Sequence, residues 1–136
     1  PEVLGVVLWP YQCAAWSIEE RVQRIVGHFE ALERVPSVFH FGVEDKLQIL
    51  DLSDFRDGAK LILDQPKWLA REGNLTLNLF NGDHRSYSLS FSLYRNTAFI
   101  AGLQGRSTPM ALDLYRDMTK DFHGLRPRDL ILDLFR

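Results

Sequence analysis

The fold class follows from one stretch of the chain, Asn74-Leu75-Thr76-Leu77-Asn78-Leu79, then Asn81-Gly82-Asp83, then Ser86-Tyr87-Ser88-Leu89-Ser90-Phe91-Ser92-Leu93. Apolar residues alternate with small polar residues in the first and third of these segments. A period of two is typical of half-buried β-strands. The Asn-Gly-Asp segment between them is a hairpin signal. These residues predict two antiparallel strands joined by a tight turn.

A third strand is expected directly after this hairpin. Arg95-Asn96 marks a turn, and the run from Thr97 to Leu103 is almost wholly apolar. Such a run is typical of a strand that is covered on both faces. Three consecutive strands with short connections predict an antiparallel meander.

The serine side of the middle strand has two interpretations. In the functional one, the hydroxyls of residues 86–92 line a polar groove. In the other, they form the solvent side of a half-buried strand, or a face whose small residues admit a closely packed helix. The second interpretation is the one that the pattern favours.

An amphipathic helix is predicted near the start of the chain. Ser17 and Glu20 form a capping-box pattern. The helix is expected to end near Arg34, because Pro36 disfavours helical geometry in the residue before it. Its apolar residues at helical spacing are Val22, Ile25, Val26, Phe29 and Leu32.

Two further helices are predicted after the meander. Thr108 suits the N-cap and Pro109 the first helical position. The apolar residues that follow recur every four positions, so this helix is expected to lie on the sheet; they are Met110, Leu114, Met118 and Phe122. Gly124 is expected at C′, just past the helix end. Pro127 begins the last helix, whose expected buried stripe is Leu130, Ile131, Leu134 and Phe135.

Residues 1–136 are therefore expected to form a single α+β domain, an antiparallel β-meander packed against α-helices. Lys46 to Leu52 and Leu61 to Leu63 are expected as strands, joined by the polar segment Ser53 to Gly58. The order of meander, turn and helix broadly resembles the N-acetyltransferase fold.

The composition excludes some classes of protein. The net charge of −2 argues against a nucleic-acid-binding role, which usually requires a basic domain. A single cysteine permits no intrachain disulfide. No segment approaches the ~20 apolar residues of a membrane span. The expected location is the cytoplasm, with the periphery of the inner membrane left open.

No familiar catalytic motif is present, and the four histidines are scattered without metal-ligand spacing. Two short segments are candidate ligand-binding sites. Gln104-Gly105-Arg106 comes between a strand end and a helix start, where backbone amides and an arginine can hold an anion. His123 and Arg126 flank the end of that helix, where they can contact a ligand. Ordinary turn and capping chemistry also explains the same residues, and the residues alone favour this interpretation.

The order and spacing of several segments resemble the bacterial VirK/YbjX family, a domain family without an assigned chemical function. The segments are Arg71-Glu72-Gly73, Tyr87 to Leu93, Gly102 to Gly105, and Thr119-Lys120 through Pro127. The resemblance implies a bacterial protein of about twice this length, associated with virulence and with resistance to antimicrobial peptides. It supplies no catalytic residues. The segment from Phe39 to Pro66 does not align with the family pattern.

Two functional hypotheses follow. The first is a non-enzymatic accessory factor in virulence or envelope stress that needs no cofactor and acts through an unknown protein partner. The second is an acyltransferase-like enzyme that binds CoA or an acyl-CoA at Gln104, Gly105 and Arg106. The enzyme hypothesis predicts that these residues share one cleft with His123 and Arg126. The capping interpretation places His123 and Arg126 on the surface, away from Gln104.

Overall fold

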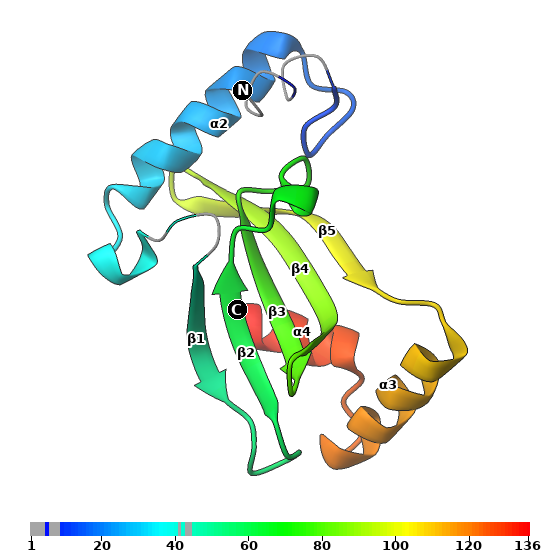
Figure 1. Ribbon diagram of the computed structural model, residues 1–136. Coiled ribbons are helices and arrows are strands. Elements are labelled where there is room, and N and C mark those ends of the chain that lie inside the picture. Colours follow the sequence, from blue (N-terminus) through cyan, green and yellow to red (C-terminus); the bar gives the residue numbers. More distant parts are fainter. Residues whose placement is uncertain (1–4, 6–8, 41, 43–44) are drawn as a thin grey trace.

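The computed structural model describes residues 5, 9–40, 42 and 45–136. Within them, one antiparallel sheet runs in the order β1-β2-β3-β4-β5 (Figure 1). Its strands are β1 (Lys46–Asp51), β2 (Ala59–Asp64), β3 (Leu75–Asn81), β4 (His84–Tyr94) and β5 (Thr97–Gly105). The helices are α2 (Ile18–Leu32), α3 (Pro109–Asp121) and α4 (Pro127–Phe135), with short 3₁₀ turns η1 (Ser37–Phe39) and η2 (Lys67–Leu69). The α+β class and the antiparallel meander are confirmed.

Both predicted hairpin turns are present. Gly82 between β3 and β4 has φ of 62°, a value that glycine adopts without the strain of a side chain. Arg95 between β4 and β5 has φ of 54° despite its side chain. In the sheet, Leu77 pairs with Leu89 and Leu79 with Tyr87, so the alternating residues of both strands share one apolar face.

This apolar face forms the core together with α4. Leu79, Leu89 and Ile131 have no exposed surface. The rings of Phe91 and Phe135 meet edge to face, with centroids 4.8 Å apart. Figure 1 shows α4 behind the strands, and its contacts are with β3 and β4. The predicted stripe of α4 is therefore the face that packs on the sheet.

The position of α3 differs from the prediction. The helix begins as expected, because the Thr108 side chain accepts a hydrogen bond from the Ala111 amide and Pro109 occupies the first turn. However, α3 lies beside the sheet and not on it (Figure 1). Only its inner residues reach the core, among them Met118 and Phe122, whereas Met110 is 83% exposed. The sheet face is already filled by α4.

The cap of α2 is confirmed, but its orientation is not what the apolar pattern indicates. Ser17 and Glu20 form both hydrogen bonds of the capping box. The side turned to the sheet carries Gly27, His28, Ala31 and Leu32. The other apolar residues lie largely in solvent, with exposed fractions of 40–52%: Ile18, Val22, Val26 and Phe29.

The expectation that the third meander strand is covered on both faces is wrong. β5 is the last strand of the sheet, and none of its residues is fully buried. Ile100, on the apolar face, is 40% exposed. The helix that covers this face contacts β3 and β4, so it leaves β5 partly open.

Candidate functional site

The serines of β4 form a buried row on the face opposite α4. None of them is more than 3% exposed: Ser86, Ser88, Ser90 and Ser92. The solvent-facing interpretation is therefore wrong. Thr76 and Asn78 of β3 continue the polar face, because they pair in register with Ser90 and Ser88. A buried polar surface is costly unless its groups are hydrogen-bonded, so their partners matter.

One group of partners is a closed network around Asn78. Its amide nitrogen donates to Oδ1 of Asp64 at 2.9 Å. Its oxygen accepts from the hydroxyl of Ser88 at 2.7 Å and from the Arg85 guanidinium. Arg85 also donates to Oδ2 of Asp64 at 2.6 Å. Since a carboxylate only accepts, Asp64 fixes the orientation of the amide, and the Ser88 oxygen retains free lone pairs.

An exposed tryptophan lies over this network. Trp68 in η2 is 64% exposed. The guanidinium carbon of Arg85 lies 5.4 Å from the Trp68 ring centre and 5.2 Å from that of Phe80. Cation–π contacts at these distances are attractive. They hold one face of the indole in place.

A hollow of about 450 Å³ opens between Trp68 and the serine row, and we call it the serine hollow. It is lined by Trp68, Arg85, Ser86, Ser88, Gln104, Gly105 and Arg106. The amide nitrogen of Gln104 donates to the carboxylate of Glu72. The amide oxygen of Gln104 has no hydrogen-bond partner within the described ranges. It therefore remains available as an acceptor.

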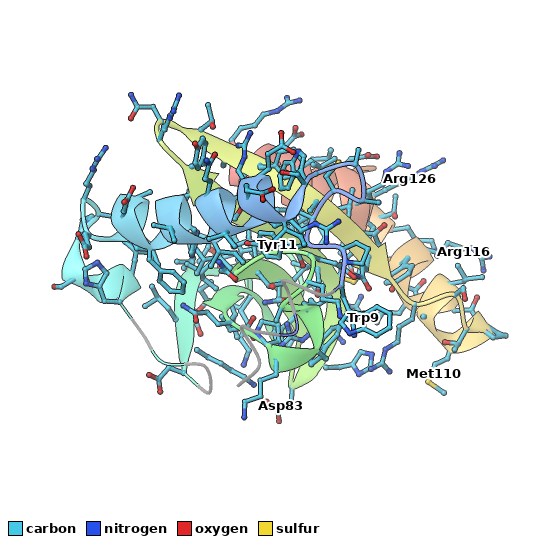
Figure 2. All side chains as sticks on the ribbon, turned by 90° about the horizontal axis from the view of Figure 1, so that it is seen from above. Trp9, Tyr11, Asp83, Met110, Arg116 and Arg126 are labelled. Atoms are coloured by element: carbon cyan, nitrogen blue, oxygen red, sulfur yellow. The ribbon has the colours of Figure 1, made fainter. Side chains whose placement is uncertain are left out.

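A second hollow of about 690 Å³ lies between the β5–α3 turn and the start of α4, and we call it the arginine hollow. Its basic residues are Arg106, Arg116, Lys120, Arg126 and Arg128, and its apolar walls include Tyr87, Leu112, Tyr115 and Pro127. Figure 2 shows Arg116 and Arg126 on the same side of the molecule. Burial raises the pKa of Tyr87, which keeps it a neutral phenol.

Three of these five cations have exposed carboxylate partners: Arg116 with Asp113, Lys120 with Asp117, and Arg128 with Asp129. Among the residues that the structure describes, Arg106 and Arg126 form no ion pair. Arg126 is also the N-cap of α4, and no side chain caps that helix end. The positive end of a helix dipole therefore adds to the charge of the two arginines.

Tyr115 holds the arginine hollow to the sheet. Its hydroxyl donates to the Ser86 carbonyl at 2.7 Å and accepts from the Arg106 amide at 2.6 Å. A side chain at Gly105 would meet this hydroxyl at 2.8 Å and the Tyr87 ring at a closer distance. Gly105 is thus required because the Tyr87 ring and the Tyr115 hydroxyl lie against its backbone. Gly105 and Arg106 line both hollows, so the two are neighbours.

The structure brings together four of the five residues proposed from the sequence, but in two hollows. Gln104, Gly105 and Arg106 line the serine hollow, and Gly105, Arg106 and Arg126 line the arginine hollow. His123 lies apart, with its ring 6.1 Å from that of Phe55. It is not part of either hollow.

Trp68 and Arg85 were not anticipated as site residues. Neither belongs to a recognised motif, and Arg85 meets Asp64 only through sheet pairing across 21 positions. The alternation of Asn74, Thr76 and Asn78 with leucine was the available signal. It places Thr76 and Asn78 on the same face as the serines, and Asn78 there is the centre of the buried network.

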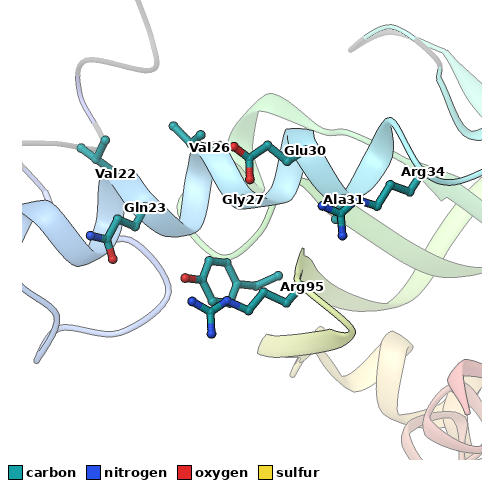
Figure 3. A pocket seen from close by; sticks show the side chains of 9 residues that line it. Val22, Gln23, Val26, Gly27, Glu30, Ala31, Arg34 and Arg95 are labelled. Carbon is teal, nitrogen blue, oxygen red and sulfur yellow. The ribbon is translucent and has the colours of Figure 1, made fainter.

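A third hollow lies between α2 and the β4–β5 turn (Figure 3). Val22, Val26 and Gly27 form one wall and Arg95 lies opposite. The Arg24 guanidinium lies 4.1 Å from the Tyr94 ring centre. No described side chain here combines burial with an unpaired charge, so this hollow offers no chemistry comparable to the other two.

Several buried polar atoms near α2 lack partners within the described residues: Tyr11 OH, His28 Nε2, Asn74 Nδ2, Thr76 Oγ1 and Ser90 Oγ. Tyr11, which Figure 2 labels near the middle of the view, has no exposed surface. Burial raises the pKa of Tyr11 to about 12 and lowers that of His28 to about 4, so both side chains are neutral near pH 7.

No group of three or more histidine, cysteine or acidic side chains suited to a metal ion occurs in the described part of the chain. The described helices include none with the length and apolar character of a membrane span.

The sequence of this chain belongs to a protein family of unknown function. The chain is a member of the DUF535 family, described as a protein of unknown function, whose pattern matches residues 1–136. This is the VirK/YbjX family that the sequence segments indicate, so that prediction is confirmed.

A relative from Haemophilus influenzae, described as an uncharacterized protein, is 36% identical over 67 residues. The matched part is 48% of this chain and 23% of that relative, so the chain matches less than a quarter of the relative's length. No solved structure matches the chain.

Proposed function

We propose that this domain binds a phosphate-bearing ligand and serves as an accessory factor, not as the chemical centre of an enzyme. The observation that carries the proposal is the pair Arg106 and Arg126, which line one hollow without an ion pair among the described residues. Two guanidinium groups that face the same space repel each other unless an anion lies between them.

Phosphate suits this arrangement better than a single carboxylate. A guanidinium forms two parallel hydrogen bonds to phosphate oxygens, and a phosphate has enough oxygens for two arginines. The uncapped amides at the start of α4 point in the direction that favours an anion. Arg116, Lys120 and Arg128 line the same hollow, but each is paired with a carboxylate, so the unpaired positive charge comes from Arg106 and Arg126.

The biological setting that we propose is the one associated with the family resemblance: virulence, envelope stress or resistance to antimicrobial peptides. The domain then senses or carries a phosphorylated molecule for a partner protein. In the native host, the Arg106→Ala, Arg126→Ala double variant is expected to restore survival of a deletion strain under antimicrobial peptides less well than the wild-type protein. Full restoration by the variant contradicts the link between the site and this role.

An acyltransferase-like enzyme that binds acyl-CoA is the second candidate. It is favoured by the apolar walls beside the cations, which Leu112 and Tyr115 provide. CoA carries phosphates and a long thiol-bearing chain, and the apolar walls can contact that chain. The Thr108 side chain and Pro109 already occupy the start of α3, so the phosphates of this ligand are assigned to Arg106 and Arg126.

Calorimetric titration with inorganic pyrophosphate at low salt tests the binding site. Arg106→Ala and Arg126→Ala are each expected to weaken binding about tenfold, as expected for the loss of a charge-assisted hydrogen bond. Arg34→Ala, the same change just past the end of the distant helix α2, is the matched control and is expected to leave binding unchanged. The proposal fails if pyrophosphate does not bind, or if all three variants bind equally.

A titration with acyl-CoA and with adenosine 3′,5′-bisphosphate separates the two candidates. Both ligands carry phosphates, but only acyl-CoA can use the apolar walls. If acyl-CoA binds more tightly than adenosine 3′,5′-bisphosphate and Leu112→Ala removes this difference, the result supports the enzyme candidate. Equal affinity of the two ligands argues for the simple phosphate-binding module.

A further inference from the structure

We infer that the serine hollow binds the uncharged part of the same ligand, and that this part is a hydroxyl-rich ring, so the ligand is a sugar phosphate. The inference rests on the proposed function, because it takes the phosphate site at Arg106 and Arg126 as its starting point. It adds the class of molecule to which the phosphate is attached.

The first step is the adjacency of the two hollows. Gly105 and Arg106 line both of them. A phosphate held by Arg106 therefore has its substituent either in the arginine hollow or past Gly105, beside Ser86 and Gln104. Arg106 is the cationic residue that the two hollows share, so it is the point from which a ligand reaches either space.

The second step is the polarity of the serine hollow. Ser88 donates its proton to Asn78, and Gln104 turns its amide nitrogen to Glu72. The Ser88 oxygen therefore presents only acceptor lone pairs, and the Gln104 amide oxygen is a second acceptor. Ligand hydroxyls are the matching donors. An acyl chain would leave these acceptors unpaired, at a cost that disfavours it.

The third step is the surface that faces these acceptors. Trp68 lies across the hollow and is 64% exposed, and Arg85 holds one face of its ring. Asp64 neutralises Arg85 at 2.6 Å, so this wall carries no free charge. A flat indole with a polar rim suits a ring that has an apolar face and hydroxyls at its edges. A pyranose has both.

The hollow is also preorganised. Asn78 is completely buried and Asp64 is 3% exposed, and together they fix Ser88 and Arg85 from below. Fixed acceptors lose little side-chain freedom when a ligand binds. The network thus has a use beyond stability, since apolar residues fill a sheet face at lower cost.

The test compares three probes by calorimetry on the whole chain: inorganic phosphate, cyclohexyl phosphate and glucose 1-phosphate. The second has a ring of the same size without hydroxyls. Glucose 1-phosphate is expected to bind about tenfold more tightly than cyclohexyl phosphate, as two new hydrogen bonds and a stacked ring allow. Trp68→Ala and Gln104→Leu are expected to remove this advantage and to leave the affinity for phosphate unchanged.

The control for folding is Trp68→Phe, which retains a ring and is expected to retain most of the advantage, together with thermal melting of each variant. Phosphate binding without any gain for glucose 1-phosphate, or a gain that Trp68→Ala leaves intact, overturns the inference but not the proposed function. If adenosine monophosphate binds and glucose 1-phosphate does not, the inference is also overturned, and the ligand is a nucleotide. If none of the probes binds, the proposed function fails and the sugar subsite fails with it.

Discussion

His28 is an ionisable residue at the centre of the contact between α2 and the sheet. Its side chain has no exposed surface, and Nδ1 accepts the Leu93 amide at 3.0 Å. That hydrogen bond requires a ring nitrogen without a proton, so the buried form is the neutral one. Burial lowers the pKa of His28 from 6.5 to about 4. A buried imidazolium would also break the contact with β4.

Stability is therefore expected to fall as the pH falls through this window. Between pH 6.5 and about 4 the unfolded chain binds a proton at His28 and the native chain does not. The stabilisation of the native state by neutral His28 is complete above pH 6.5. Its loss on acidification lowers the free energy of unfolding by about 3 kcal/mol. Urea unfolding at pH 7.5, 5.5 and 4.5 measures it.

The control is His28→Asn, which keeps an acceptor near the Leu93 amide and does not titrate. Other groups affect both proteins alike, so the difference in slope between wild type and variant isolates His28. Identical slopes contradict the assignment of the pH dependence to this residue.

His123 lies in a backbone position that normally takes glycine. It has φ of 53° just after α3, its amide donates to the Lys120 carbonyl, and the Gly124 amide donates to Thr119 at 2.7 Å. This is the Schellman arrangement, with His123 and not Gly124 at C′. The prediction that placed Gly124 there is wrong by one residue.

His123→Gly is expected to stabilise the fold by about 1 kcal/mol relative to His123→Ala, because only glycine adopts a positive φ without a steric cost. Alanine serves as the reference since it also lacks the contact with Phe55. Thermal unfolding of both variants gives the comparison. A glycine variant no more stable than the alanine variant means that the left-handed geometry costs nothing here.

Local residue chemistry was predictable from the sequence where it depends on neighbours in the chain. Ser17 and Glu20 cap α2, and Thr108 caps α3, because each partner lies three residues away. Arg106 and Arg126 were predictable for the same reason, because each lies beside a helix end in the sequence. Trp68 could not be found in this way, because its role depends on Arg85, which reaches it only in the folded sheet.

At the scale of the elements, the helical spacing of apolar residues in α2 does not identify its buried face. Its apolar residues repeat at the right spacing, yet the face against the sheet is built from Gly27, His28, Ala31 and Leu32. A side chain at Gly27 would meet the Tyr94 ring at 2.5 Å. The close approach of helix and strand selects small residues for the contact, and hydrophobicity alone does not reveal that preference.

Two alanine substitutions in α2 are therefore expected to differ widely. Leu32 is 8% exposed, and Leu32→Ala is expected to cost about 2–4 kcal/mol. Val26 is 50% exposed, and Val26→Ala is expected to change stability by less than about 0.5 kcal/mol, because the higher helix propensity of alanine offsets a small loss of burial. Urea unfolding compares them. Equal losses show that Val26 is packed in solution.

The strands show the same limit of sequence reasoning. Alternation assigns leucine and serine to opposite faces of β4, and this was correct. It does not say what covers the serine face, because the residues that do so come from α2, η2 and the segment around Tyr11. The apolar character of β5 indicated burial, but its place at the sheet edge follows from the strand order.

Among the α-helices that the structure describes, α3 has the weakest attachment to the sheet. It lies beside the sheet, and its ties are few (Figure 1). Near the middle of the helix, Tyr115 bonds to β4 and to Arg106, just after β5. The β1–β2 connection holds its end: Phe55 packs on Phe122 with ring centroids 5.8 Å apart, and Arg56 pairs with Asp121. Few contacts of this kind favour local opening before global unfolding.

Arg56 is expected to control how often α3 opens. Its Nε donates to Asn81 at 2.7 Å while its Nη1 pairs with Asp121, so it joins the end of β3 to the end of the helix. Arg56→Met removes both contacts, and the α3 amides are expected to exchange with deuterium roughly fivefold faster, which corresponds to about 1 kcal/mol. The amides of β3 and β4 are expected to keep their rates. Arg116→Met removes an exposed pair within α3 and is expected to change the exchange rates by less than about twofold. Uniform acceleration of helix and sheet by Arg56→Met would mean instead that α3 opens only with the whole molecule.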